Sequence, residues 1–467
     1  ALGLLLAAES MPALARLLPV GFPRTDELGV DRWVLAFTFG ISALSGILFG
    51  LAPALQCWQS GVSETLKTAG PIGQAGRGGR LRGGFVAGEI GLVLVLLTGA
   101  GLMLNSLWRL VNVDLGFEPH NVLAVRIALP RAYFAQSGAR AIAFEQQLIA
   151  RVRALPSVTQ VGTTDSVPIA GVDYTGQFGI QGGRPVGSYQ VAKWRAVSAD
   201  YFSLMRIPVL RGRAFIERDG ARAPKVVIIS QSCAGQYFAG ADPIGRRVEV
   251  GRSDEPREIV GIVADVHLSQ VRDSRVEPTI YMPKPQEPLT VTWLVARTAS
   301  PASLSAPIRR AVRDLDPAVP VELVTTMDDV VNESIADARF YAMSLGGLAC
   351  VALLLAAVGI YGVVSYSVGQ RLTEIGIRLA LGASRAAVFR TVLGGVAASV
   401  AIGVTVGVAG AWALARLVAG FLFEVRPRDP WTLAAVTALL CLVALAAACI
   451  PARRATRIDP MAVLRCE

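Results

Sequence analysis

Residues 431–450 have the sequence WTLAAVTALLCLVALAAACI, which contains no charged side chain. A helix rises about 1.5 Å per residue, so a run of this length crosses the roughly 30 Å hydrocarbon core of a bilayer. Four further segments are of comparable length and mostly apolar: residues 33–56, 84–108, 341–367 and 392–422. Residues 1–20 resemble the outer end of another. The sequence therefore predicts a multi-pass α-helical membrane protein.

The composition agrees with this prediction. Hydrophobic residues make up 53% of the chain and charged residues 17%, and the mean hydropathy is +0.49. A soluble protein of this size carries about 25% charged residues. Buried core helices of a large soluble protein are the alternative, and five such runs in one chain weigh against it.

The run at residues 431–450 belongs to a pattern that occurs twice. Residues 13–17 recur letter for letter at 413–417. Six further residues recur at a spacing of 398, namely Asp31, Trp33, Leu35, Pro53, Ala54 and Leu66, which match Asp429, Trp431, Leu433, Pro451, Ala452 and Leu464. So long a period indicates a duplicated multi-helix unit. Because the first copy starts inside an apolar run at Ala1, we expect residues 1–56 to be its truncated last two helices.

The net charge of +10 is concentrated in three stretches. Arginines cluster in the linker 57–83, in the loop 368–390 and in the tail after residue 451. All three lie on one side if every apolar run crosses once, and the positive-inside rule places that side in the cytoplasm. Segments 109–340 and 423–430 are then outside. The Gly/Arg linker suits a tether near anionic lipid, and we expect no nucleic-acid partner.

The exported segment, residues 109–340, is long enough for one or two small domains. Its pattern predicts an α+β domain, with a helix of about 18 residues from Ser137 whose apolar stripe contains Phe144, Leu148 and Val152. Further elements are expected as strands at 122–129, 158–163, 225–230, 246–250, 258–263, 291–296 and 319–324, and as a helix at 304–315. Two βαβ-like units result, with a β-rich part inserted between them.

The chain offers little for catalysis. None of its four lysines (Lys67, Lys193, Lys225 and Lys284) stands in the G-x-x-x-x-G-K-[ST] motif that cradles ATP phosphates. His120 and His267 form no paired metal motif, and Cys233 is the one cysteine of the exported segment. The acidic residues Asp265, Asp273 and Glu277 show no defensible pairing. We expect no enzyme activity, no cofactor and no metal.

Two features of the apolar runs concern helix packing. Gly46-x-x-x-Gly50 and Gly403-x-x-x-Gly407 have the spacing that lets helices approach closely. Glu89 lies only a few residues into its run, where we expect it to reach lipid headgroups or Arg80 and Arg82 rather than to relay protons.

Four stretches resemble bacterial ABC-transporter permeases of the MacB/FtsX-like type, particularly the duplicated orphan permeases. They are RLTEIGIRLALGAS at 371–384, PARRATRIDPMAVLR at 451–465, YFAGADPIGRRV at 237–248 and IVGIVADV at 259–266. The resemblance covers essentially the whole chain. It implies one helix, a periplasmic domain and then three helices, with the domain combining a porter-like α/β part and a β-rich part.

The first of these stretches is the predicted contact with a separate ABC ATPase. Glu374 and Arg378 would share a charged helical face, while Ile375, Leu379 and Leu381 form an apolar centre. The predicted contact consists of Glu374, Ile375, Gly376, Ile377, Arg378, Leu379, Ala380, Leu381, Gly382 and Ala383. An amphipathic helix lying on the membrane surface is the alternative.

The predicted domains are the remnant of a first permease unit (1–56), a cytoplasmic linker (57–83), a transmembrane helix (84–108), a MacB-like periplasmic core domain (109–340) and an FtsX-like permease domain (341–467). We expect an inner-membrane permease that couples ATPase motion to the periplasmic domain for efflux or extrusion of a periplasmic or lipid-derived substrate. Its expected partners are membrane lipid, the ATPase, and a first permease half or a second permease copy. An FtsX-type regulator of a periplasmic enzyme and a receptor signalling inward are the alternatives.

Overall fold

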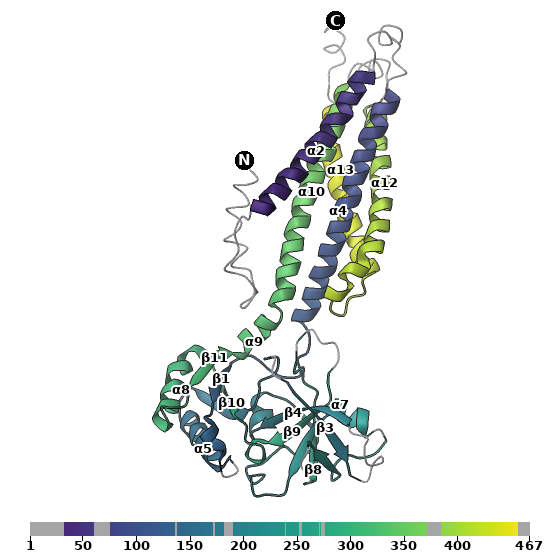
Figure 1. Ribbon diagram of the computed structural model, residues 1–467. Coiled ribbons are helices and arrows are strands. Elements are labelled where there is room, and N and C mark those ends of the chain that lie inside the picture. The colour runs from purple at the N-terminus through teal and green to yellow at the C-terminus, as the bar shows by residue number, and fades with distance from the viewer. Residues whose placement is uncertain are drawn as a thin grey trace, which may run out of the picture. The chain divides into compact units, whose positions relative to one another are not determined.

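The computed structural model describes residues 32–59, 75–135, 138–170, 173–181, 190–238, 240–251, 255–269, 271, 276–370 and 384–455. These residues fall into two compact units (Figure 1). One, here called the helical unit, lies before Arg109 and after Ala336. The other, here called the globular unit, is Arg109–Ala336, so it is inserted in the chain between two helices of the first.

The helical unit is built from long helices on the apolar runs. They are α2 (Arg32–Gln59), α4 (Ala75–Val111), α10 (Ala336–Gln370), α12 (Arg385–Val418) and α13 (Pro430–Ala455), with the short η5 (Ala419–Phe421). Among the described residues four spans are long and apolar enough to cross a membrane: Gly83–Val111, Ala336–Gly369, Phe389–Leu417 and Pro430–Arg454. Helices suit lipid because all their backbone hydrogen bonds are internal. In α2 the apolar stretch is shorter, Arg32–Leu44, so a span there stays a prediction.

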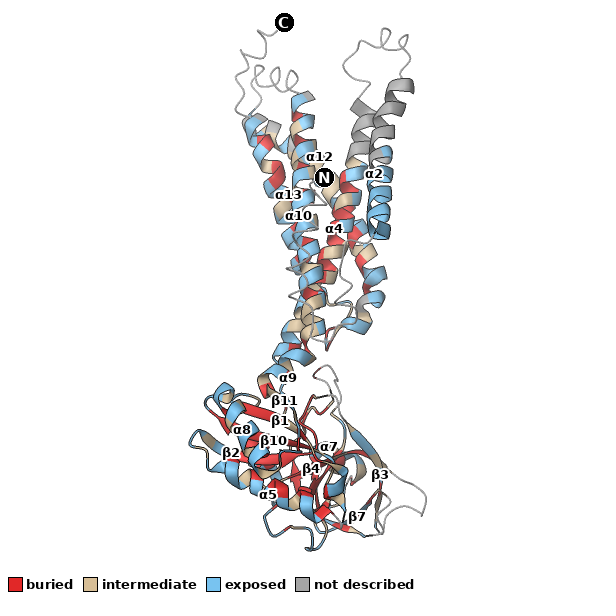
Figure 2. Ribbon diagram, turned by 60° about the vertical axis from the view of Figure 1, so that its left-hand side comes forward, coloured by how far each residue is buried: buried red, intermediate tan, exposed pale blue. Residues whose placement is uncertain are grey.

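Helix α4 is the central helix of this unit. Of its membrane-length window 56% is buried, against 22% for α10, 12% for α12 and 22% for α13. Ile90 and Leu94 of α4 are fully buried in one cluster with Ile360 of α10 and Leu440 of α13. Figure 2 shows buried stretches along these helices. Large apolar side chains on the outer faces, such as Leu354, are exposed, as expected for helices in contact with lipid.

The globular unit is α+β. Its strands are β1 (Val122–Ala128), β2 (Val158–Thr164), β3 (Tyr174–Ile180), β4 (Gln190–Val197), β5 (Val209–Gly212), β6 (Val226–Ser230), β7 (Arg247–Val250), β8 (Arg257–Val263), β9 (Thr279–Pro283), β10 (Val291–Thr298) and β11 (Val321–Thr326). Its helices are η2 (Arg131–Phe134), α5 (Ala139–Arg153), α6 (Tyr201–Leu204), α7 (Gln231–Tyr237), η4 (Lys284–Gln286), α8 (Pro301–Leu315) and α9 (Met327–Ser334). Four spanning helices and an α+β unit agree with the predicted fold class.

The first part of the globular unit consists of two interleaved split βαβ units. Its strand order is β11-β1-β10-β2, and each neighbouring pair is antiparallel. Helix α5 connects β1 to β2, and α8 connects β10 to β11. The predicted stripe of α5 is in the core, where Phe144, Leu148 and Val152 are buried with Leu304 and Ile308 of α8. The predicted helix start at Ser137 lies outside the described residues.

The second part, from β3 to β9, is inserted between β2 and β10. Its strands follow the order β4-β3-β7-β8-β6-β9, and β9 pairs back with β4 in parallel, which closes a barrel of these strands. Strand β5 pairs with β8 outside this ring. The barrel core contains Phe178, Val227, Val248, Ile259 and Ile280, all buried. The expectation of a β-rich part inserted into a βαβ-like part is therefore confirmed. The two parts join through the pair Thr164–Val197 of β2 and β4.

Candidate functional site

Helices α4 and α12 are in backbone contact. A Cβ atom added at Gly403 would lie 2.7 Å from the carbonyl oxygen of Ala87, and one at Gly407 would lie 2.9 Å from that of Gly91. Both distances are shorter than any side chain tolerates, so only glycine allows this approach. The prediction for Gly403-x-x-x-Gly407 is confirmed, and that for Gly46-x-x-x-Gly50 in α2 stays a prediction.

Gly403→Ala is expected to lower the stability of the helical unit, because the new methyl group must push the backbones of α4 and α12 apart. Overpacking of this kind costs about 1–3 kcal/mol. The matched control is Gly394→Ala in the same helix, since a Cβ at Gly394 meets nothing within 4 Å. Thermal unfolding of the purified chain in detergent measures the difference. Equal melting temperatures for the two variants would show that the contact is loose.

The carboxylate of Glu89 in α4 faces Gly359 of α10. A Cβ atom added at Gly359 of α10 would lie 2.7 Å from one carboxylate oxygen of Glu89 and 3.0 Å from the other. The absent side chain at Gly359 therefore leaves the space that the carboxylate occupies. The expectation that Glu89 reaches lipid headgroups or Arg80 and Arg82 stays a prediction, since the side chains of these two arginines lie outside those that the structure describes.

The predicted ATPase-contact residues, Glu374–Ala383, lie outside the described residues. Their neighbours are described: α10 ends at Gln370, and α12 begins at Arg385. Ser384 is the N-cap of α12, and its hydroxyl oxygen accepts a hydrogen bond of 3.3 Å from the backbone N–H of Ala387. The contact therefore stays a prediction about a segment that joins two candidate membrane spans.

Polar contacts hold the connection between α12 and α13, and one of them reaches α4. The hydroxyl of Ser106 in α4 accepts a hydrogen bond of 2.7 Å from the backbone N–H of Phe423. Asp429 caps α13, because its carboxylate accepts a hydrogen bond of 3.0 Å from the backbone N–H of Thr432. Asp429 is one of the residues repeated in the sequence, and helix capping gives a physical reason for an aspartate at that position.

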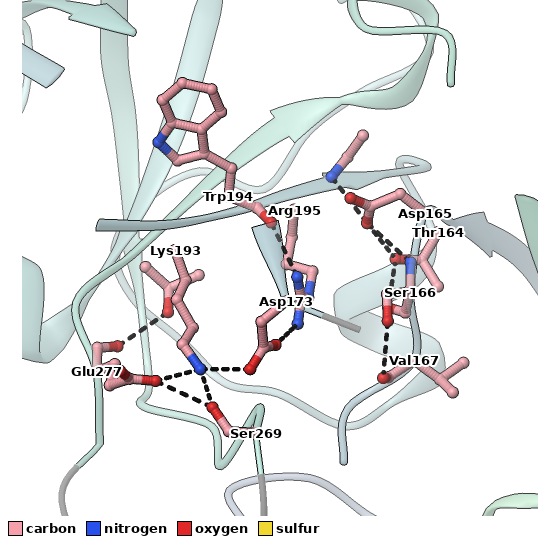
Figure 3. A network of polar contacts seen from close by, with 12 residues as sticks. Thr164, Asp165, Ser166, Val167, Asp173, Lys193, Trp194, Arg195, Ser269 and Glu277 are labelled. Atoms are coloured by element: carbon pink, nitrogen blue, oxygen red, sulfur yellow. Dashed lines mark hydrogen bonds and ion pairs between the residues drawn. The ribbon is translucent and has the colours of Figure 1, made fainter. Parts of the chain in front are cut away.

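A buried polar network lies in the globular unit (Figure 3). Lys193 and Arg195 of β4 are 4% and 1% exposed, and both pair with Asp173. The Lys193 ammonium lies 2.6 Å from one oxygen of Asp173 and also contacts Ser269 and Glu277. The partner of Glu277 is thus a cation and not another carboxylate. Its partner, Lys193, is far away in the sequence.

The network shifts the pKa values of its acids in opposite directions. Burial alone would raise the pKa of Asp173, but hydrogen bonds from Lys193 and Ser269 and the charge of Arg195 hold it below its ordinary value. Asp165 lies nearby, and burial raises its pKa, although Arg195 and Lys284 oppose the shift. Its carboxylate accepts hydrogen bonds from the backbone N–H groups of Ser166 and Ala196. Lys193 and Arg195 pair with carboxylates from other parts of the chain, so the network holds loops to β4.

The remaining candidate side chains are separate from one another. The Nδ1 atom of His120 lies 2.6 Å from a carboxylate oxygen of Asp328 at the start of α9. Cys233 is buried in the barrel core, and burial raises the pKa of its thiol to about 12. In the part of the chain that the structure describes, no three His, Cys, Asp or Glu side chains gather as a metal site would require.

Comparison with known proteins gives two matches to family models. The MacB-like periplasmic core domain matches residues 90–315, and the FtsX-like permease C-terminal domain matches residues 346–460. The macrolide export ATP-binding/permease protein MacB of Azoarcus sp. (strain BH72) is 27% identical over 289 residues, which are 58% of this chain and 42% of that protein. The pyoverdine export ATP-binding/permease protein PvdT of Pseudomonas aeruginosa is 24% identical over 281 residues, which are 57% of this chain and 41% of that protein. The chain thus spans about two fifths of the length of these relatives.

Among solved structures, the periplasmic region of MacB from Actinobacillus actinomycetemcomitans is 13% identical with a TM-score of 0.32, over 48% of this chain and 95% of that one. The extracellular domain of YknZ from Gram-positive bacteria is 17% identical with a TM-score of 0.29, over 43% of this chain and 100% of that one. The family models match the globular unit and the last three helices in the order that the resemblance implied. The chain belongs to the family of ABC-transporter permeases that combine a MacB-like periplasmic core domain with an FtsX-like permease domain.

Proposed function

We propose that the chain is a permease subunit of an ABC-type export system and works by mechanical transmission. In this mechanism a separate ATPase binds the segment 374–383, its closure moves the membrane helices, and their motion changes the shape of the periplasmic domain. Four candidate spans and an inserted α+β domain support this proposal. The relatives are named as export proteins, which supports an export function. The macrolide and pyoverdine in those names are the compounds of those proteins and are not assigned to this chain.

The observation that carries the proposal is the continuity of α10. This helix runs without a break from Ala336 to Gln370, about 50 Å at 1.5 Å per residue. At its start a single residue, the buried Ile335, separates it from α9, which packs on β1 and β11. At its end it leads directly into the predicted ATPase contact. A continuous helix that is connected to α9 at one end and to the predicted ATPase contact at the other can transmit a displacement across a membrane.

The ATPase is proposed to be a separate chain, since no lysine of this sequence stands in a phosphate-binding loop. The other proposed partners are membrane lipid and either a first permease half or a second permease copy. Residues 109–340 are proposed to be periplasmic, and the C-terminus cytoplasmic, because arginines such as Arg453 and Arg454 gather at that end of α13. The apolar packed core of the helical unit favours extrusion of a periplasmic or lipid-derived substrate over conduction through a hydrophilic pore.

Affinity purification of the tagged full-length chain from its native membrane tests this function. We expect an ATPase with a Walker-A motif to co-purify, and its ATP turnover to change when the permease is removed. The proposal fails if no such ATPase is recovered after mild solubilisation and chemical cross-linking.

A further inference from the structure

A cleft of about 450 Å³ lies inside the globular unit, where α5 meets the elements inserted after β2. Helix α5 lines it with Ile142, Glu145, Gln146, Ile149 and Arg153, which share one helical face. The rest of the lining comes mainly from residues 197–200, 215–217, 219 and 283–285. The volume is within the range of small-molecule sites.

Two oppositely charged side chains are buried in this lining. Glu145 is 7% exposed and Lys284 is 2% exposed. Glu145 is well satisfied, because the hydroxyl of Thr292 donates to it at 2.6 Å and that of Thr163 at 3.4 Å. Lys284 is not. Its ammonium lies 3.9 Å from Glu145 and 3.4 Å from the carbonyl oxygen of Val291, whereas a good N–H···O bond is about 2.9 Å and an ammonium has three donors.

The other charges of the cleft have partners or face water. Arg153 pairs with Asp200 at 2.6 Å, and Asp219 accepts two hydrogen bonds from Arg213, at 2.8 and 3.0 Å. Glu217 is exposed. An acceptor supplied by a ligand therefore gains most at Lys284, because its ammonium has three N–H donors and its contacts with Val291 and Glu145 are long.

The chemistry of the lining defines the ligand class. Lys284 and Glu145 are neutral as a pair. An uncharged acceptor therefore completes the hydrogen bonds of the Lys284 ammonium without placing a second negative charge beside Glu145. Ile142, Ile149 and Phe215 give the cleft an apolar surface. We propose that the cleft binds an amphiphile with an apolar chain and an uncharged ester or amide carbonyl, which accepts a hydrogen bond from Lys284. Only the identification of this ligand as an exported substrate rests on the proposed function.

Photoaffinity labelling of the full-length chain in nanodiscs tests the proposal. The probes are two octyl chains with the same diazirine, one ending in an N-methyl amide and the other in a primary amine. We expect the amide to label peptides containing residues 142–153 or 215–217, and the amine, which has no carbonyl to accept a hydrogen bond from Lys284, to label them about tenfold less.

Two adjacent glutamines, Gln146 and Gln147, provide the control that separates binding in the cleft from labelling by probe dissolved in the lipid. Gln146→Trp fills the cleft and is expected to reduce amide labelling about tenfold, whereas Gln147→Trp, one residue outside the lining, changes it less than about twofold. The double change Glu145→Gln with Lys284→Met removes both charges and is expected to abolish the preference for the amide. Labelling that survives Gln146→Trp, or that favours the amine, overturns the proposal. The assay needs no ATPase, so its failure is distinct from failure of the proposed export function.

Discussion

Leu379→Asp is expected to abolish binding of the partner ATPase while the chain still inserts into the membrane and the globular unit still folds. In the proposed contact Leu379 is the apolar centre, and an aspartate there would be a desolvated charge without a partner. Truncating such central residues costs about 2–4 kcal/mol, which corresponds to roughly 30- to 700-fold weaker binding. Co-purification of the ATPase and permease-dependent ATP turnover are the two measurements.

Ser384→Asp is the matched control for the same change in charge. Ser384 is exposed and caps α12, and aspartate is an equally good cap, so the helix is retained. We expect ATPase binding within about twofold of that of the unmodified chain. If Leu379→Asp binds the ATPase as well as Ser384→Asp does, residues 374–383 are only a surface helix, and the coupling proposal falls.

Arg195→Met is expected to destabilise the globular unit by about 3–5 kcal/mol, since removing one partner of a buried ion pair leaves the other charge uncompensated. Arg195 is 1% exposed and pairs with Asp173. Hydrogen exchange of the peptides that contain β4, measured in the full-length chain, reports the loss of stability. Arg218→Met, a change at an exposed arginine, should have no measurable effect. Equal protection in the two variants would mean that Lys193 alone satisfies Asp173.

The same network predicts a dependence on pH. The pKa of Asp173 is lower in the folded state than in the unfolded chain, so its contribution is fully present above about pH 4 and is lost as the pH falls through the lowered value. The pKa of Asp165 is raised, so its contribution has the opposite sign and decreases as the pH rises above about 4. Arg195→Met should weaken the acid-induced loss that Asp173 causes. An unchanged acid-unfolding profile in this variant would contradict the assignment.

The sequence predicted a strand well where neighbouring apolar side chains bury it, and missed a strand whose buried side chains are charged and have partners far away in the sequence. Strands β6, β7 and β8 lie close to the predicted residues, because their apolar side chains alternate or run together within a few positions. Strand β4 was missed because it contains Lys193 and Arg195. These residues are buried there because they pair with Asp173, Ser269 and Glu277, which come from other parts of the chain.

The apolar runs by themselves determined the membrane helices, because a backbone in lipid must satisfy its hydrogen bonds within its own segment. The period of 3.6 residues likewise determined which face of α5 is buried. Only the tertiary structure decided that β10 lies between β1 and β2, that β9 closes the barrel on β4, and that Glu89 faces Gly359. It also brought Lys284 next to Glu145, 139 positions apart in the sequence, in one cleft. Pairing between distant segments depends on the free energy of the whole fold, and local sequence patterns carry no record of it.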